Sequence, residues 1–257
     1  MVFIHHNGIR YYRFDTLQTR HALFTRHGGV SPDPWGSLNV GGTVGDDLER
    51  VRENRILSFQ AMGCAPESIF DVWQIHSTDV VCARAPRPPD ESYRQADIIL
   101  TDQPDVTLFM RFADCVPIMV HDPRRGVIGL AHAGWMGTLR GVANATVEAL
   151  KKNYGSNPVD LIAGIGPSIG PDHYEIGADV ILQVMQKHGD EADMILKSHH
   201  GKIHFNLWEA NRLALERAGM GCIEISGICT ACHTEDWFSH RAEKGRTGRF
   251  GALISLQ

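Results

Sequence analysis

The stretch RFADCVPIMVHDPRRGVIGLAHAGW, residues 111–135, carries the strongest indication of the fold of this chain. It holds two short apolar runs, 116–121 and 127–132, which are separated by the turn-forming sequence Asp-Pro-Arg-Arg-Gly. Runs of this length, rich in valine and isoleucine and bounded by Asp, Pro and Gly, are typical of β-strands. The stretch therefore predicts two strands that follow each other directly, with no helix between them.

Further short apolar runs predict strands, and four longer segments predict helices. The helices are indicated by acidic first turns, a one-sided apolar face and a closing glycine, and Asn206 with Glu209 resembles a capping box. The predicted strands are residues 22–25, 69–75, 80–83, 96–100, 106–111, 159–165, 224–228 and 252–256, and the predicted helices are residues 46–62, 138–152, 178–187 and 206–219. Because strands outnumber helices and several are adjacent, we predict an α+β or mixed-sheet α/β fold in a single domain, residues 1–257.

The composition narrows the class of protein. The chain has 257 residues, of which 43% are hydrophobic and 21% charged, and its net charge is -5. A negative balance argues against a nucleic-acid partner, because phosphate binding needs an excess of Lys and Arg. The first residues do not resemble a secretory signal, and no apolar run reaches the roughly 18 residues of a membrane helix. We therefore expect a cytoplasmic protein with no membrane partner, whose six cysteines are thiols or metal ligands.

Two histidines and a cysteine lie at predicted strand ends in the middle of the chain. His76 follows one predicted strand, Cys115 precedes a second and His132 ends a third. Imidazole and thiolate are good zinc ligands, and three protein ligands leave the fourth position open, as in catalytic sites. Two other interpretations stay open: the three are half-buried residues without chemistry, or a thiolate of Cys115 acts as a metal-free nucleophile beside His132.

A second pattern lies near the C-terminal end, where residues 229–233 read CTACH. C-x-x-C-H is the attachment pattern of c-type haem, but that attachment follows export, for which the chain gives no signal. Zinc nucleobase deaminases combine H-x-E with P-C-x-x-C. Residues 173–175 are H-x-E, but Ile228 stands in place of the proline, and the cysteine pair ends a predicted strand instead of opening a helix. We therefore interpret the CTACH pattern as a coincidence.

Two further stretches are suited to binding an anion. Residues 25–31, TRHGGVS, combine Arg26 with glycine backbone N–H groups and a hydroxyl, and residues 239–249, SHRAEKGRTGR, contain Arg241 among other cations. Backbone N–H groups and cationic side chains together form anion-binding loops, although the same composition is common in solvated turns.

Taken together, these motifs resemble the YfiH family, which is described both as laccase-like multicopper polyphenol oxidases and as purine nucleoside-processing enzymes. The resemblance runs from about residue 24 to residue 256. The runs that carry it are FTRHGGVS (24–31), SLNVGGTVGDD (37–47), QIHSTDV (74–80), ADCVPIMVHDP (113–123), LAHAGW and GT (130–138), GIGPSIGP (164–171), CT (229–230), FSHR (238–241) and GRTGRF (245–250).

The resemblance implies a fold, a reaction and a metal. The implied fold is a mixed-sheet αββα sandwich like that of cytotoxic necrotising factor. The implied activities are phosphorolysis of adenosine, inosine and methylthioadenosine to base plus ribose 1-phosphate, together with deamination of adenosine. The family's metal ligands fall on His76, Cys115 and His132, so we expect zinc there, with copper as the alternative metal. The expected partners are purine nucleosides and phosphate, and the oligomeric state stays open.

The charges that these reactions involve suggest roles for further residues. We expect Asp114 to handle protons or to orient a ligand, and Arg26, Asn39 and Arg241 to contact phosphate and ribose. Two positions depart from the family pattern, because Met136 and Ala242 stand where the family has arginines. These departures bear on phosphate binding more than on metal binding. Cys232 and His233 fall outside the motifs that match.

Two other functions are weighed against this one. A copper-dependent polyphenol oxidase would use the same three ligands, but multicopper oxidases need many more histidines in paired motifs, and the sequence contains no H-x-H. A metal-free cysteine hydrolase built on Cys115 and His132 would act on amide bonds. It would survive chelation and be inactivated by alkylation.

Overall fold

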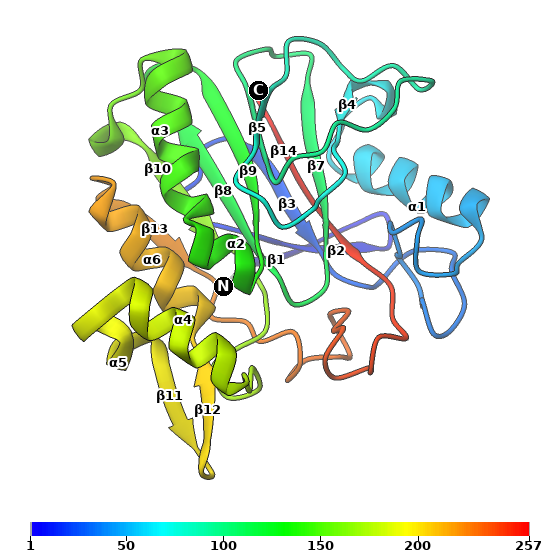
Figure 1. Cartoon of the computed structure of the whole chain (residues 1–257). Coiled ribbons are helices and arrows are strands. Elements are labelled where there is room, and N and C mark those ends of the chain that lie inside the picture. The colour runs from blue at the N-terminus through cyan, green and yellow to red at the C-terminus, as the bar shows by residue number, and fades with distance from the viewer. Residues whose placement is uncertain (1, 257) are drawn as a thin grey trace.

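The strands form two six-stranded sheets and one hairpin in the computed structural model, which describes residues 2–256 (Figure 1). The first sheet has the order β1 (Val2–His6), β2 (Ile9–Arg13), β3 (Arg20–Phe24), β14 (Phe250–Ser255), β7 (Thr107–Phe112), β4 (Ile69–Phe70). The second has the order β13 (Cys222–Ile225), β10 (Ile162–Ile165), β8 (Val116–Asp122), β9 (Val127–Ala133), β6 (Ile98–Thr101), β5 (Val80–Cys82). The hairpin consists of β11 (Leu196–His199) and β12 (Lys202–Phe205).

The two strands predicted within residues 111–135 form the centre of the second sheet. β8 and β9 pair antiparallel as a hairpin, with Val116 opposite Ala133 and Asp122 opposite Val127. All seven residues of each strand are buried. A strand that is buried on both faces reads as a continuous apolar run, which explains why these two strands show little alternation in the sequence.

Six helices lie around the sheets within the described residues. They are α1 (Leu48–Ala61), α2 (Trp135–Arg140), α3 (Val142–Tyr154), α4 (Ala178–His188), α5 (Ala192–Ile195) and α6 (Leu207–Arg217). The side chain of Asp47 caps α1 by accepting from two of its N–H groups, and Asn206 caps α6 by accepting from the N–H of Glu209. The predicted capping box is only half formed, because the N–H of Asn206 donates to the backbone oxygen of Ile195 and not to Glu209. The helix predicted at 138–152 is two helices, because Gly141 has a φ of 90° and breaks it.

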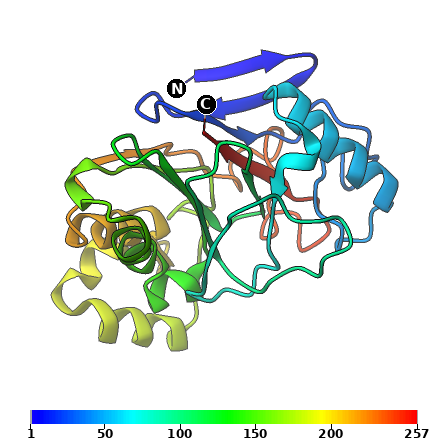
Figure 2. The same ribbon diagram turned by 90° about the horizontal axis from the view of Figure 1, so that it is seen from above.

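Three apolar cores separate four layers. Ile118 packs with Leu150 in the core between the second sheet and α3, and Met119 packs with Ile254 in the core between the two sheets. Phe59 of α1 belongs to the third core, on the outer face of the first sheet. In Figure 2 the green and orange helices accordingly lie on the side of the second sheet away from β14, which is drawn in dark red. The predicted α+β fold with an αββα sandwich is confirmed.

The strand predicted at 69–75 was too long, because β4 ends at Phe70. Beyond it the chain leaves the sheet, and the buried carboxylate of Asp71 accepts from the guanidinium of Arg87 at 2.8 Å. The segment that follows carries His76, so its departure from the sheet places that histidine near the end of the β8–β9 hairpin. No helix within residues 2–256 has the length and apolar character needed to cross a membrane.

Candidate metal centre and cleft

The three predicted ligands come together at one end of the second sheet. Cys115 directly precedes β8 and His132 lies in β9 opposite Pro117, so the hairpin register brings both to the same edge. His76 reaches them from the loop after β4, with its Nε2 3.9 Å from Sγ of Cys115. The ligand atoms of the three residues all lie within 4.8 Å of one another.

This donor set fits a zinc ion by its chemistry and by its surroundings. A thiolate and two imidazoles are ligands that zinc prefers, and three are the number found in catalytic sites. Gly134 leaves the space around them open: a Cβ at this position would lie 2.9 Å from Sγ of Cys115 and 2.9 Å from Cδ2 of His76. Any other residue at 134 would displace the ligands.

Asp97 orients both histidines, and the sequence analysis did not identify it. Its Oδ1 lies 2.7 Å from Nδ1 of His132. Its Oδ2 accepts from the backbone N–H groups of Ile75 at 3.0 Å and Ser77 at 2.7 Å, the two residues that flank His76. A carboxylate on Nδ1 leaves Nε2 of His132 as the ligand nitrogen, the arrangement typical of zinc-bound histidines. The available signal was an acidic residue at the start of an apolar strand.

The pKa values of the ligands favour a thiolate. Burial opposes ionisation of Cys115, but the nearby His132 and His76 outweigh it and lower the pKa of the thiol to about 6. Burial likewise disfavours charge on His132, but Cys115 and Asp97 raise its pKa to about 9. A thiolate that is already formed near neutral pH is ready to bind a metal. The same ion pair is also what a metal-free cysteine nucleophile requires.

The backbone is strained where it carries these groups. His76 has a φ of 61° and Asp114 a φ of 82°, both in the left-handed region that non-glycine residues rarely adopt. Such strain persists only where the surroundings fix it, and it is concentrated at functional sites. Asp114 is fixed by its carboxylate, because Oδ1 accepts from Oγ1 of Thr230 at 2.7 Å and Oδ2 accepts from the N–H of Arg241 at 2.7 Å. Asp114 thus ties the C-terminal loop to the metal centre.

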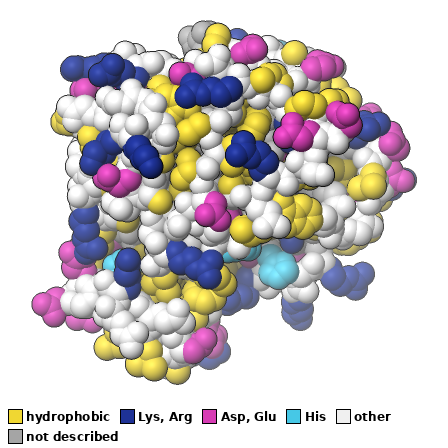
Figure 3. Space-filling model, turned by 45° about the horizontal axis from the view of Figure 1, so that its top comes forward, with side chains coloured by type: hydrophobic (Ala, Val, Ile, Leu, Met, Phe, Trp, Pro, Cys, Tyr) yellow, Lys and Arg dark blue, Asp and Glu magenta, His cyan; other side chains and the backbone are white. Residues whose placement is uncertain are grey.

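A cleft of about 1110 Å³ opens onto the three ligands. Its walls include the side chains of Trp73, which is 45% exposed, and Tyr93, and three arginines that surround one buried carboxylate. These arginines are Arg55, Arg87 and Arg111, and their partner is Asp71. The cleft therefore combines aromatic surface with positive charge. On the face drawn in Figure 3, Lys and Arg side chains are intermingled with Asp and Glu.

Arg241, one of the predicted phosphate contacts, lines the cleft. Its guanidinium lies over the ring of Tyr174, 5.0 Å from the centroid, and donates to the backbone oxygen of Glu175 at 3.0 Å. Arg26 does not line the cleft. Its guanidinium donates to the backbone oxygens of Gly36 and Thr234, so it joins two loops.

Asn39 is also outside the cleft, fully buried, but it positions a residue that lines it. Its Oδ1 accepts from the N–H groups of Gly41 and Arg249, both at a distance between 2.8 and 2.9 Å. Arg249 lies in the cleft wall, with Nη1 bonded to the backbone oxygens of Thr247 and Gly248. No acceptor within residues 2–256 pairs with its Nε or Nη2, so these donors are available to a ligand.

The two departures from the family pattern fall at different places. Met136 lines a separate hollow of about 510 Å³ together with Arg140. Arg140 donates through Nη1 to the backbone oxygen of His76 at 2.8 Å, so this arginine supports the metal centre from behind. Ala242 is exposed on the loop next to Arg241.

Known proteins resemble this chain over nearly its whole length. A family model described as multi-copper polyphenol oxidoreductase laccase matches residues 20–257. The purine nucleoside phosphorylase of Deinococcus radiodurans is 37% identical over 97% of this chain and 94% of its own, and purine nucleoside phosphorylase YfiH of Escherichia coli is 33% identical over 90% and 91%. The crystal structure of the hypothetical protein YfiH of Bacillus licheniformis superposes with a TM-score of 0.92, at 32% identity over 99% of both chains. The chain therefore belongs to the YfiH family.

Proposed function

We propose that this protein is a zinc-dependent purine nucleoside phosphorylase that also deaminates adenosine. The observation that carries the proposal is the cleft in which three zinc-type donors, unpaired arginine nitrogens and exposed aromatic rings meet. The names of the Deinococcus radiodurans and Escherichia coli relatives support the phosphorolysis reaction. The substrates are adenosine, inosine and methylthioadenosine, each cleaved by phosphate to base plus ribose 1-phosphate.

Each part of the cleft has a task in this reaction. Trp73 and Tyr93 offer flat surfaces on which a purine stacks. Arg249 and Arg241 offer N–H donors for phosphate, which guanidinium groups bind through charge-assisted hydrogen bonds. His76, Cys115 and His132 hold the zinc ion, and Asp97 keeps His132 in the orientation that binding needs. When bound, zinc supplies a Lewis acid that lowers the pKa of water, which is the chemistry that deamination of adenosine requires.

The test is incubation of the purified protein with each nucleoside, with and without phosphate and with and without a chelator. We expect the free base and ribose 1-phosphate only when phosphate is present, and inosine plus ammonia from adenosine in its absence. Elemental analysis of the same sample distinguishes zinc from copper. Turnover of no nucleoside, together with amidase activity that survives chelation and is lost on alkylation, would instead establish the cysteine hydrolase. That second candidate is favoured by the Cys115–His132 ion pair.

Replacing Arg249 by glutamine should weaken phosphate binding. The variant loses charge-assisted hydrogen bonds of about 1.5–3 kcal/mol, so the KM for phosphate should rise roughly 10- to 100-fold. Deamination, which consumes water instead of phosphate, should change much less. Steady-state kinetics with varied phosphate measures the effect. Arg84→Gln is the matched control, because Arg84 is 60% exposed, pairs with Asp102 and lies outside the cleft wall. Equal phosphate KM values in the two variants would contradict the assignment.

A further inference from the structure

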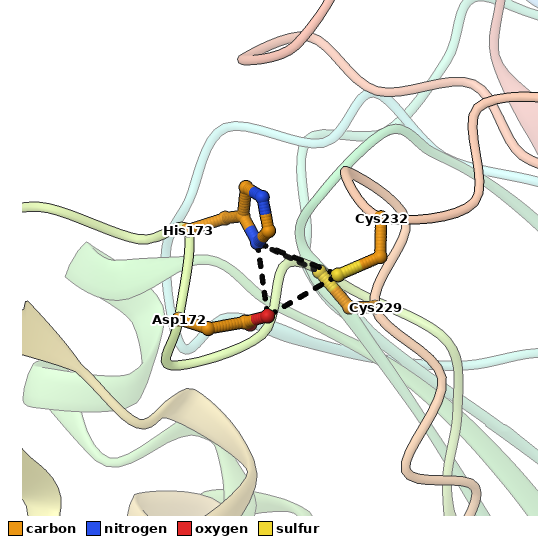
Figure 4. Close-up of side chains that lie close together, drawn as sticks. All are labelled: Asp172, His173, Cys229 and Cys232. Carbon is orange, nitrogen blue, oxygen red and sulfur yellow. Dashed lines mark hydrogen bonds and ion pairs between the residues drawn. The ribbon is translucent and has the colours of Figure 1, made fainter.

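Four other metal-type donors converge outside the cleft. They are the side chains of Asp172, His173, Cys229 and Cys232, whose ligand atoms all lie within 4.8 Å of one another (Figure 4). Both cysteines are free thiols. Three of the four, His173 and the two cysteines, belong to the zinc-deaminase pattern that was set aside on the sequence, and the structure adds the carboxylate of Asp172 to them. His233 stays outside the group, with its Nδ1 3.1 Å from a carboxylate oxygen of Glu235.

The spacing of these donors is close to that of a tetrahedral zinc site. Zinc–sulfur bonds of about 2.3 Å and zinc–nitrogen or zinc–oxygen bonds of about 2.0 Å place neighbouring ligand atoms about 3.3–3.8 Å apart. Nδ1 of His173 lies 3.1 Å from Oδ2 of Asp172, 3.4 Å from Sγ of Cys232 and 3.8 Å from Sγ of Cys229. The remaining measured edge, from Sγ of Cys232 to Oδ2 of Asp172, is 3.2 Å.

The second sheet produces this arrangement. β10 and β13 are parallel neighbours, and their pairing continues past both strands to a bridge between Ser168 and Cys229. The turn that follows Ser168 returns on itself at Gly170, whose oxygen accepts from the N–H of His173 at 3.1 Å. The two loops therefore leave the sheet side by side, one carrying the acid and the imidazole and the other carrying both thiols.

A backbone N–H group donates to the thiol of Cys229, as backbone N–H groups do to metal-bound cysteines. The N–H of Gly170 points at its Sγ at 3.2 Å, and a donor of this kind stabilises a thiolate and fixes its direction. A Cβ at Gly170 would lie 2.7 Å from Oδ1 of Asp172 and 3.0 Å from Cβ of Cys229, so a larger residue there would press on two of the four donors. Cys229 is buried, whereas Asp172, His173 and Cys232 are exposed, so an ion can reach the site from solvent.

We propose that Asp172, His173, Cys229 and Cys232 bind a second zinc ion. Four protein ligands close the coordination sphere, so this site is structural, in contrast to the three-ligand centre in the cleft. A disulfide between the two cysteines would make no use of the acid and the imidazole that converge on them. The proposal does not depend on the reaction assigned to the cleft.

The second site would hold the wall of the cleft in place. Thr230, between the two cysteines, donates to Oδ1 of Asp114, and the backbone of Arg241 donates to Oδ2 of the same carboxylate. Zinc bound at Cys229 and Cys232 therefore anchors the beginning of the loop that carries Arg241 to the cleft.

Zinc stoichiometry tests the proposal on the full chain, reduced, loaded with zinc and freed of excess by gel filtration. Elemental analysis should give about two zinc ions per chain for the wild type and about one for Cys232→Ser and for His173→Ala. Cys115→Ala should also retain about one, and Cys115→Ala combined with Cys232→Ser close to none. Cys222→Ser is the matched control, since Cys222 lies on β13 outside both groups, and it should keep about two.

Two results would overturn the proposal. In the first, the wild type binds a single zinc ion, Cys115→Ala binds none, and both Cys232→Ser and His173→Ala still bind one. In the second, the purified protein shows two fewer titratable thiols before reduction than after it, as a disulfide would cause, and the reduced protein binds no second zinc ion. Circular dichroism confirms that each variant is folded. Because the readout is metal content, it stands whether or not the cleft turns over nucleosides.

Discussion

Cys115→Ala should remove the cleft zinc and lower nucleoside turnover by about a thousandfold or more. The thiolate is the single anionic ligand of that centre, and two imidazoles alone leave zinc weakly held. Loss of several kcal/mol of metal-derived stabilisation corresponds to at least three orders of magnitude in rate. Elemental analysis and steady-state deamination of adenosine measure the two effects on one preparation.

Cys222→Ala is the control for that variant, because it removes a thiol from the same sheet without touching a ligand. It should keep both its zinc content and its activity. If Cys115→Ala lost its zinc and still turned nucleosides over at the wild-type rate, zinc would have no part in the reaction. If both properties were retained, Cys115 would not be a ligand.

Asp97→Asn should weaken zinc binding at the cleft and turnover by roughly 10- to 100-fold, the usual effect of losing a carboxylate behind a zinc-bound histidine. Asp97 accepts three hydrogen bonds, from Nδ1 of His132 and from the N–H groups of Ile75 and Ser77. An asparagine has one oxygen and one NH₂ group, so in either orientation an N–H faces another donor. The mismatch falls on His132 in one orientation and on the backbone that flanks His76 in the other.

Competition with a chromogenic chelator measures the zinc affinity of this variant. Asp102→Asn supplies the same chemical change at a carboxylate that pairs with the exposed Arg84 and lies outside the site. It should bind zinc as the wild type does. Equal affinities for Asp97→Asn and Asp102→Asn would show that the carboxylate behind His132 does not orient the metal site.

The sequence predicted those strands and helices whose apolar runs and helix-end residues are clear within a short stretch. The β8–β9 hairpin, the acidic first turn of α1 and the N-cap of α6 were visible, because buried runs and helix-end signals act over a few residues. The β1–β2 hairpin was missed although Asn7-Gly8 is a typical two-residue turn, with φ values of 50° and 81°. Its flanking histidines and arginines hide the apolar alternation.

The site was predictable only in part, because its geometry depends on contacts between distant segments. The chemistry of the expected reactions suggested roles for Asp114, Arg26 and Asn39, but their hydrogen bonds decide which of them reach the cleft. Cys232 meets His173 across 59 residues of sequence. The zinc-deaminase pattern pairs these two residues, but it was set aside because its proline and its helix are missing, and only the folded chain shows that the side chains meet. His76, Cys115 and His132 were singled out because each adjoins a strand or strand-like run and the family resemblance names all three, and the structure brings them together.

The arginines around the buried carboxylate of Asp71 affect how rate and binding constants of this protein depend on salt. It offsets one of the three positive charges that surround it, so Arg55, Arg87 and Arg111 leave a net surplus of positive charge in the cleft wall. A concave surface with such a surplus draws anions toward it, and dissolved salt weakens the attraction over a distance of about 8–10 Å. Rate and binding constants for any anionic substrate of this protein are therefore comparable only at matched ionic strength.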